Sequence, residues 1–503
     1  MPEKNVNRES LRILLKGWIR PTAVLSLTYM ICLSSILQAD FMYRDDLRRA
    51  AEGARGWGFG RYLSLAFSLL LHTDTYLSDI SPLPQMLAVV LISAACIVLH
   101  RVLKGDDTFT FFEYAALLPV GLYPYFLGCI SYKYDSVYMA FSVLVSLIPL
   151  LMREAGTVRY GAVVFVSTLA MCMTYQASSG IFPAMVVLTA VIGWTEKKQS
   201  VAQTARFLIC SAAGYAAGLI VFRLFFVRWG DEYVDTSLTG ISGFLPTALA
   251  NYRKYAGLFM KEFRLEWKLC LAVLCILGIC AMIKRSERGK AASLIVVLAG
   301  TGAAAVLSLG IYPILSKPLF QPRAMYGTGV LIAALGLTAV LNTASSDGTV
   351  SGACLRKYFV KCTVFTMSFL FAVFAFTYGN ALQAQADFTD FRTRQLISDL
   401  IGLKEFDLEE EKLLQLSGDI GFAPLIQNMP EQYRLIRRLV PHTLKGGYMW
   451  GEYGFFHYYG LPNIVKDDTV DLTEEDLPVL LENSFHTIKG DKNRFLILIR
   501  KQE

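Results

Sequence analysis

The chain has 503 residues, of which 54% are hydrophobic and 18% are charged, with a net charge of +7 and a mean hydropathy of +0.43. A chain this apolar is not one soluble core and indicates a polytopic membrane protein. The positive charge lies mostly in short loops and the ten cysteines lack metal-ligand spacing, which excludes nucleic acid as an expected partner and gives no predicted metal site.

The first apolar run extends from about residue 21 to residue 39, after a basic N-terminal segment. It is long for a signal peptide and lacks a small-x-small cleavage site, so we interpret it as the first membrane span. A charged segment follows directly, from Phe41 to Arg49, and contains Asp45 and Asp46. Charge at a membrane boundary is costly unless it is solvated or used. This segment is therefore the first candidate for chemistry.

Further apolar runs predict about eleven spans in total. They lie near residues 85–103, 109–130, 136–152, 161–175, 181–194, 207–227, 269–283, 291–309, 327–341 and 358–378. The run at residues 63–71 is too short to cross a bilayer and is expected to lie at the interface.

An odd number of spans places the two termini on opposite sides of the membrane. The loops that this count assigns to the cytoplasm are rich in arginine and lysine. The positive-inside rule therefore predicts an N-terminus inside and a C-terminus outside. Asp45 and Asp46 are then expected on the extracytoplasmic face.

The composition changes after residue 380, where charge rises and cysteine disappears. Predicted helices at residues 387–403, 431–439 and 474–482 alternate with predicted strands at residues 412–416 and 494–499. We expect a multi-span membrane domain at residues 1–380 and a small extracytoplasmic α/β domain at residues 381–503.

The residues expected on the outer face form one candidate site. Asp45 and Asp46 are the candidate catalytic residues. The candidate ligands of a donor phosphate are Arg44, Lys133, Lys317 and Arg323, and the candidates for positioning acceptor or sugar are Tyr132, Asp135 and Gln176. Carboxylates with fixed cations at a membrane surface suit a phosphate-bearing lipid substrate.

These residue types permit sugar transfer from a polyprenyl phosphate. Phosphate leaves without a protonating acid, so one carboxylate suffices as the general base for the acceptor hydroxyl. The second carboxylate can hold the acceptor or a metal ion, whereas a hydrolase needs two carboxylates flanking the bond. The plainer alternatives are a solvated helix end for Asp45 and Asp46 and a local ion pair between Asp135 and Lys133.

The chain also resembles the membrane glucosyl transferase II family, bacterial enzymes with a C-type (GT-C-like) glycosyltransferase architecture. The resemblance covers the whole membrane region and is carried by Tyr43-Arg44-Asp45-Asp46, Gly60-Arg61-Tyr62-Leu63, Ser81-Pro82, Pro124-Tyr125-Phe126-Leu127, Ser131-Tyr132-Lys133-Tyr134-Asp135-Ser136, Tyr175-Gln176-Ala177-Ser178, Pro322-Arg323-Ala324-Met325-Tyr326-Gly327 and Tyr378-Gly379-Asn380.

This resemblance implies a sugar donor, glucose in particular, on undecaprenyl phosphate. It implies a surface glycan as the acceptor, such as an O-antigen, a wall polymer or a lipid-linked glycan. It also implies a catalytic acidic residue in the first outer loop. It does not decide between Asp45 and Asp46, and it leaves open whether a divalent metal ion takes part.

We therefore predict an inverting glycosyltransferase that uses a polyprenyl-phosphate sugar on the extracytoplasmic face of a bacterial cytoplasmic (inner) membrane. One alternative is a transporter or flippase of lipid-linked saccharides, which would need polar residues or broken helices at the bilayer midplane and an internal repeat. The other is a non-catalytic scaffold of the cell envelope, in which the two aspartates would be dispensable.

Overall fold

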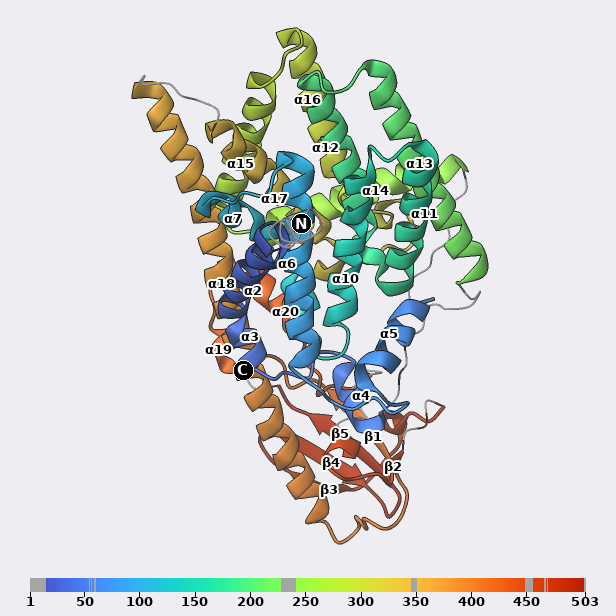
Figure 1. The fold of residues 1–503 in the computed structure, drawn as a ribbon. Helices are drawn as coiled ribbons and strands as arrows, with labels where there is room; N and C mark the ends of the chain where they lie inside the picture. Colours follow the sequence, from blue (N-terminus) through green and yellow to red (C-terminus); the bar gives the residue numbers. More distant parts are fainter. Residues whose placement is uncertain are drawn as a thin grey trace, which may run out of the picture.

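The computed structural model describes residues 15–53, 55, 57, 60–227, 241–344, 351–447, 456–465, 467 and 469–501. Residues 1–14, for which the cytoplasmic side is expected, lie outside this part. The helices gather into one bundle, and a five-stranded sheet lies at one end of it (Figure 1). The chain begins its described part with the single π-helical turn η1 (Leu15–Ile19).

The first half of the bundle contains several short helices as well as long ones. Its helices are α2 (Arg20–Cys32), α3 (Ser34–Gln38), α4 (Asp46–Glu52), α5 (Tyr62–His72), α6 (Leu83–Lys104), α7 (Phe111–Leu117), α8 (Pro119–Leu122), α9 (Leu127–Ile130), α10 (Ser136–Leu147) and η2 (Ile148–Met152). Proline accounts for two of the breaks, because Pro119 begins α8 and Pro149 lies at the start of η2.

The second half is built mainly from long helices. The helices of this half, long and short, are α11 (Thr157–Thr174), η3 (Gln176–Gly180), α12 (Ile181–Thr195), α13 (Val201–Phe225), α14 (Ile241–Glu262), α15 (Leu265–Lys284), α16 (Lys290–Leu307), η4 (Tyr312–Ile314), η5 (Pro322–Ala324), α17 (Gly327–Ala344) and α18 (Ser351–Ile401).

Seven helices of the described part are long and apolar enough to cross a membrane. The predicted helical membrane protein is confirmed, because every predicted span coincides with helical segments. The other predicted spans fall on shorter or interrupted helices, such as α2 and α3, which are separated at Leu33. The count of eleven and the GT-C-like architecture stay predictions.

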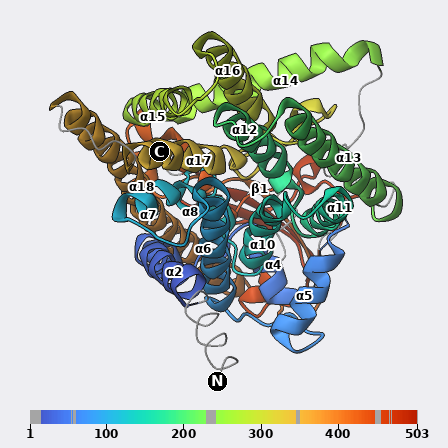
Figure 2. The same ribbon diagram turned by 45° about the horizontal axis from the view of Figure 1, so that its top comes forward.

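The bundle has an inner and an outer layer of helices. In the apolar stretch of η3 and α12, 72% of the residues are buried, against 22% for α13 and for α16. Figure 2 shows α6, α10, α12 and α17 surrounded by the other helices. Large apolar side chains of the outer layer, such as Ile209, Phe225 and Ile295, remain exposed. Such a surface suits the hydrocarbon of a bilayer as its solvent.

The sheet is formed by the last part of the chain. Its strands are β1 (Lys412–Gly418), β2 (Ile464–Val465), β3 (Val479–Glu482), β4 (His486–Gly490) and β5 (Arg494–Ile499), in the order β2-β1-β5-β4-β3. Strand β1 is parallel to β2 and β5, and the remaining pairs are antiparallel. Short helices connect them, namely α19 (Pro424–Gln427), η6 (Glu431–Tyr433), α20 (Arg434–Leu439) and η7 (Leu472–Glu474).

The secondary structure predicted after residue 380 is partly right. The strands at residues 412–416 and 494–499 are confirmed as β1 and β5, and residues 431–439 form η6 and α20. The helix predicted at residues 474–482 is wrong, because Val479–Glu482 pair with β4 as β3. Pro478 precedes this strand and disfavours a helical conformation in the residue before it.

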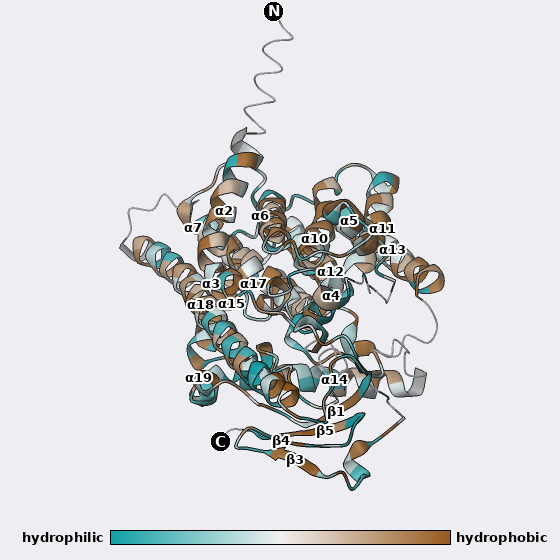
Figure 3. Cartoon of the chain, turned by 90° about the horizontal axis from the view of Figure 1, so that it is seen from below, coloured by the Kyte–Doolittle hydropathy of each residue, from teal (hydrophilic) through white to brown (hydrophobic). Residues whose placement is uncertain are grey.

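Helix α18 joins the bundle to the sheet. It continues without interruption through the predicted boundary after residue 380, and its second half runs beside the sheet (Figure 1). Figure 3 shows the first half as mostly hydrophobic, whereas the half that passes α19 carries many hydrophilic residues. Leu396 and Leu400 pack with Leu414 and Leu416 of β1. The division into domains at residue 380 stays a prediction.

Two contacts bring the bundle and the sheet region together around the segment between α3 and α4. Leu47 of α4 belongs to the apolar core of the sheet region. Conversely, helix α20 of the sheet region buries three side chains in the core of the bundle, namely Leu435, Ile436 and Leu439. The segment with Asp45 and Asp46 therefore lies at the junction of the two parts.

Candidate active site

Asp45 and Asp46 lie at the start of α4, at the end of the bundle that faces the sheet (Figure 1). In the segment that leads from α3 into α4, Asp40 and Arg44 have left-handed backbones with φ of 43° and 55°. This conformation is uncommon for residues other than glycine, and such residues cluster at functional sites. The local chain path is thus strained next to both candidate carboxylates.

Asp46 is completely buried and connects two loops. Its Oδ2 accepts hydrogen bonds from the backbone N–H groups of Tyr43, at 3.2 Å, and Lys133, at 2.9 Å. Its Oδ1 has no hydrogen-bond partner within the described ranges. Burial, followed by the neighbouring charge of Asp45, raises the pKa of Asp46 well above its usual value. Asp46 therefore holds the site's backbone and is poorly placed to meet a substrate.

Asp45 and Asp135 share one arginine. Arg49, one helical turn after Asp45, binds Asp45 Oδ2 through Nη2 at 2.9 Å and Asp135 Oδ2 through Nη1 at 2.8 Å. The Trp57 indole N–H donates to Asp135 Oδ1, and its ring lies 4.8 Å from the Arg49 guanidinium. The Asp45 side chain keeps 24% of its surface exposed, against 5% for Asp135.

The two carboxylates therefore differ in what they can do. Both oxygens of Asp135 are bonded, whereas Asp45 Oδ1 has no hydrogen bond to any described residue. Burial opposes ionisation of Asp135, but the charges of Arg49 and Arg61 outweigh it and hold its pKa below the usual value. Asp135 is a buried anion that fixes Arg49, and Asp45 offers an open oxygen.

Lys133 is directed toward two other carboxylates. Its Nζ lies 2.6 Å from Asp40 Oδ1 and 3.2 Å from Asp79 Oδ2, and the side chain is buried. Burial lowers its pKa, but these two carboxylates outweigh burial and raise it overall. Its charge is thus matched by Asp40 and Asp79, and its role as a ligand of the donor phosphate stays a prediction.

Arg323 and Arg44 converge on Tyr132. Arg323 of η5 donates through Nη1 to the Tyr132 hydroxyl, and the rings of Tyr43 and Tyr132 pack edge to face at 4.8 Å. Burial raises the pKa of Tyr132 well above its usual value, and the charges of Arg323, Asp45 and Arg44 also act on this phenol. The structure therefore brings together Asp45, Tyr132, Arg44 and Arg323 from three distant parts of the chain.

Two predicted residues lie farther from this group. Lys317 is exposed in the segment between η4 and η5. Gln176 is half-buried at the start of η3, next to Tyr175, whose ring lies 5.2 Å from the Arg61 guanidinium. Gln176 is therefore near the cluster through its neighbour, whereas Lys317 makes no hydrogen bond or ion pair with any described residue of the cluster.

The sheet region contributes a further arginine. Arg438 of α20 binds the buried Glu262 and donates to the Phe320 carbonyl oxygen, and the charge of Arg44 is near enough to affect it. Beside it, the Tyr43 hydroxyl donates to the Leu439 carbonyl oxygen at 2.7 Å. The residue that precedes Arg44 and Asp45 is thus bonded directly to the C-terminal part.

Three members of this site are not among the residues predicted from the sequence, namely Arg49, Trp57 and Arg61. One signal was available for Arg49, because residues four apart face each other on a helix and Asp45 precedes it by four positions. Arg61 belongs to the motif Gly60-Arg61-Tyr62-Leu63 that carries the family resemblance, whereas no sequence pattern marks Trp57, which reaches the cluster through the tertiary fold. In the described part of the chain, no three His, Cys, Asp or Glu side chains are grouped as metal ligands would be.

The family model of the glucosyl transferase GtrII matches residues 34–334, which is more than half of the chain. An uncharacterized 55.3 kDa protein in the gtrB 5′ region of Salmonella phage P22 is 25% identical over 433 residues, covering 83% of this chain and 85% of its own length. No solved structure matches. The matched region contains Asp45, Arg49, Asp135 and Arg323, and the chain belongs to the glucosyl transferase GtrII family.

Proposed function

We propose that this glycosyltransferase moves glucose from a polyprenyl phosphate to a cell-surface glycan, such as an O-antigen, on the extracytoplasmic face of the inner membrane. The observation that carries the proposal is the group of Asp45, Arg44 and Arg323 around Tyr132, with one oxygen of Asp45 left open. Carboxylate and guanidinium groups are what base-assisted sugar transfer from a phosphate requires.

In this proposal Asp45 is the general base. Arg49 binds one of its oxygens and so fixes the direction of the carboxylate. The open oxygen accepts the proton of the acceptor hydroxyl while that hydroxyl attacks the anomeric carbon. Asp135 acts through Arg49 as a positioning residue, and Asp46 acts through the two backbone N–H groups that it binds.

Arg323 and Arg44 are proposed to bind the departing phosphate. Their charges stabilise the negative charge that develops on the phosphate oxygen as the anomeric bond breaks. Guanidinium groups suit this role because they stay charged and can bind phosphate through two N–H groups. Attack by the acceptor opposite the departing phosphate needs one base and inverts the anomeric centre, so we propose an inverting reaction.

The experiment measures transfer of labelled glucose from glucosyl polyprenyl phosphate to lipid-linked glycan by the purified full-length protein in detergent. We expect Asp45→Asn to lower kcat about 100-fold or more, which is the usual contribution of a general base. Asp74→Asn is the matched control, because this carboxylate is exposed on the loop after α5, and it should retain wild-type activity.

Two results would overturn the proposal. The first is an Asp45→Asn protein whose activity stays within about threefold of wild type, which no general base allows. The second is wild-type protein that forms no product in detergent but moves labelled donor across sealed vesicles. That second result would support the alternative of a transporter or flippase of lipid-linked saccharides, because a flippase needs an intact bilayer and a transferase does not.

A further inference from the structure

A cavity of about 470 Å³ lies at the other end of the bundle from Asp45. Helix α6 runs from the Asp45 end of the bundle to the cavity. It begins shortly after Asp79, which pairs with Lys133, and it ends at Lys104, which lines the cavity. Its 22 residues correspond to about 33 Å at 1.5 Å per residue, close to the thickness of the hydrocarbon core. The cavity therefore belongs to the opposite membrane face.

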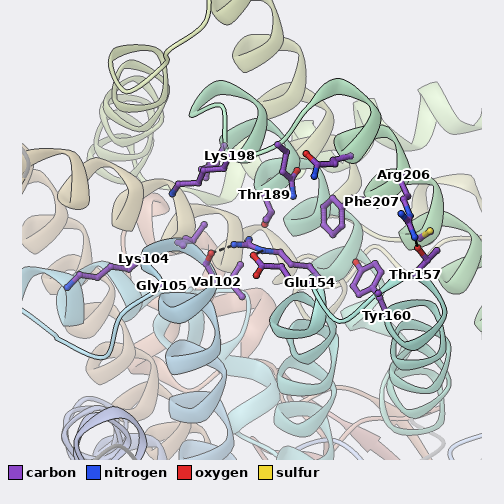
Figure 4. Close-up of a pocket in the computed structure, with 18 residues that line it drawn as sticks. Val102, Lys104, Gly105, Glu154, Thr157, Tyr160, Thr189, Lys198, Arg206 and Phe207 are labelled. Carbon is purple, nitrogen blue, oxygen red and sulfur yellow. Dashed lines mark hydrogen bonds and ion pairs between the residues drawn. The ribbon is translucent and has the colours of Figure 1, made fainter.

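The lining is strongly cationic. Lys104, Arg153, Lys198 and Arg206 line the cavity together with one acid, Glu154. In Figure 4, Arg206 and Thr157 lie on one side, Lys104 and Lys198 on the other, and Thr189 lies between them. The cations come from the ends of α6, η2 and α13 and from the segment after α12.

The two lysines are matched by carboxylates. Lys104 Nζ lies 3.2 Å from Glu113 and also from Asp106, and Lys198 Nζ lies 2.6 Å from Glu196. The excess positive charge of the cavity therefore comes from its two arginines.

Among the residues that the structure describes, no close, buried carboxylate neutralises either arginine. Arg206 donates to the Thr157 hydroxyl, which is neutral. Arg153 donates to the Val102 carbonyl oxygen at 3.4 Å, and its carboxylate neighbour Glu154 is 3.8 Å away with 87% of its side chain exposed. Guanidinium groups do not lose their charge in proteins. Two positive charges therefore face this cavity with little compensation.

Helix ends and hydroxyl groups add to this preference for an anion. The N-terminal turns of α11 and α13 contribute Thr157 and Gln203 to the lining, and the positive end of a helix dipole attracts anions. The Thr189 hydroxyl is buried in the same lining and has no hydrogen-bond partner in the part of the chain described here. An unpaired buried hydroxyl is costly and is satisfied by a polar ligand.

Apolar side chains complete the lining, including Leu103, Ile192 and Phe207. A site that combines cations with apolar side chains between membrane helices fits an amphiphile better than a soluble ion. We propose that this cavity binds the phosphate group of an anionic lipid, with Arg153 and Arg206 as its ligands. By the loop charges this is the cytoplasmic leaflet. The proposal does not depend on the transfer reaction.

The test uses full-length protein that has been stripped of lipid in detergent. Binding of phosphatidylglycerol is measured by titration, and phosphatidylcholine and inorganic phosphate are measured in parallel. The test variant carries Arg153→Gln and Arg206→Gln. The control variant carries Arg159→Gln and Lys284→Gln, two exposed cations on the same membrane face that do not line the cavity, so both variants lose the same charge.

We expect the test variant to bind phosphatidylglycerol about tenfold more weakly than wild type, with the control variant unchanged, because two charge-assisted contacts are lost. Equal affinity in all three proteins would overturn the site. Inorganic phosphate that binds as tightly as the lipid would overturn the assignment to a lipid. If the double variant does not fold, Arg153→Gln and Arg206→Gln are measured singly, and unchanged affinity in both would also overturn the site.

Discussion

At the scale of single residues, the adjacent Asp45 and Asp46 occupy contrasting environments. Asp46 is enclosed and binds two backbone N–H groups, whereas Asp45 is partly exposed and bound to Arg49 through one oxygen. The difference follows from the start of α4, where successive residues point in different directions. We expect this division to hold in function, with Asp45 acting on the substrate and Asp46 holding the loops that surround it.

The pKa shifts of Asp46 and Asp135 predict opposite responses to pH. The pKa of Asp46 is raised by burial, so the folded protein binds this proton more tightly than the unfolded chain. Its contribution to stability is present at acid pH and is lost as the pH rises from about 4 through the raised pKa. The pKa of Asp135 is lowered by Arg49 and Arg61 against the effect of burial. Its contribution is present above about pH 4 and is lost on acidification.

We therefore expect Asp46→Asn to keep or raise the thermal transition temperature at pH 7. The transition temperature of this variant should also fall less steeply with rising pH than that of the wild type. Asp135→Asn should lower the same temperature at pH 7, because it removes one partner of the buried Arg49, a change that costs about 3 kcal/mol. Thermal unfolding of each purified variant between pH 5 and pH 8 measures these transition temperatures. A destabilised Asp46→Asn protein with an unchanged pH profile would contradict the assignment.

The sequence could predict which residue types gather at the site but not how they pair. Asp45, Tyr132 and Arg323 were expected on one face from the span count, and the structure places them together. Lys133 was expected beside the donor phosphate, but its partners are Asp40 and Asp79. Which carboxylate a cation meets depends on the tertiary contacts of loops, and no local pattern in the sequence contains that information.

At the scale of elements, the position of the Asp45 segment depends on the packing of α3 against α18. Gly379 of α18 faces α3 so closely that a Cβ atom there would overlap the side chain and backbone of Ser35. Seven residues separate α3 from α4, so a shift of α3 is transmitted directly to Asp45. Close approach of helices through small residues is common in membrane proteins.

Gly379→Ala is expected to destabilise the protein by about 1–3 kcal/mol, because neither the backbone of α3 nor that of α18 can move freely. It should also lower transferase activity through the displaced Asp45. Gly302→Ala in α16 is the matched control, since nothing lies within 4 Å of the added methyl group, and it should be neutral. Unfolding temperature and kcat are measured for both variants; equal values in the two would show that the contact with α3 does not position the site.

Elements were predicted best where one physical signal dominates. Hydropathy located the membrane helices. Strand β5 is a nearly continuous apolar run, and β1 is a run of leucines interrupted by Gln415. The length of α18 could not be predicted in the same way. A change in hydropathy near residue 380 marks where the helix meets more polar surroundings, but the backbone hydrogen bonds continue to Ile401.

At the scale of the whole molecule, the sheet region is tied to the bundle by more than the chain connection. Leu435, Ile436 and Leu439 are buried in the core of the bundle, and Arg438 provides the cation for the buried Glu262. The sequence shows a helical pattern at these residues but not that it inserts into the membrane part. This insertion bears directly on whether residues 381–503 form an independent domain.

Deletion of residues 404–503 tests this dependence. The shortened chain keeps all of α18 but exposes the apolar contacts of α20 and leaves Glu262 buried without its arginine, and an unpaired buried charge is strongly destabilising. We expect its thermal transition to fall by at least about 5 °C, with loss of transfer activity. Phe495→Ala, which loosens the core of the sheet and leaves α20 in place, serves as the comparison and should affect the bundle much less. A shortened protein that unfolds at the wild-type temperature would instead establish residues 381–503 as a separate domain, and the junction around Asp45 would then be a contact between two independently stable parts.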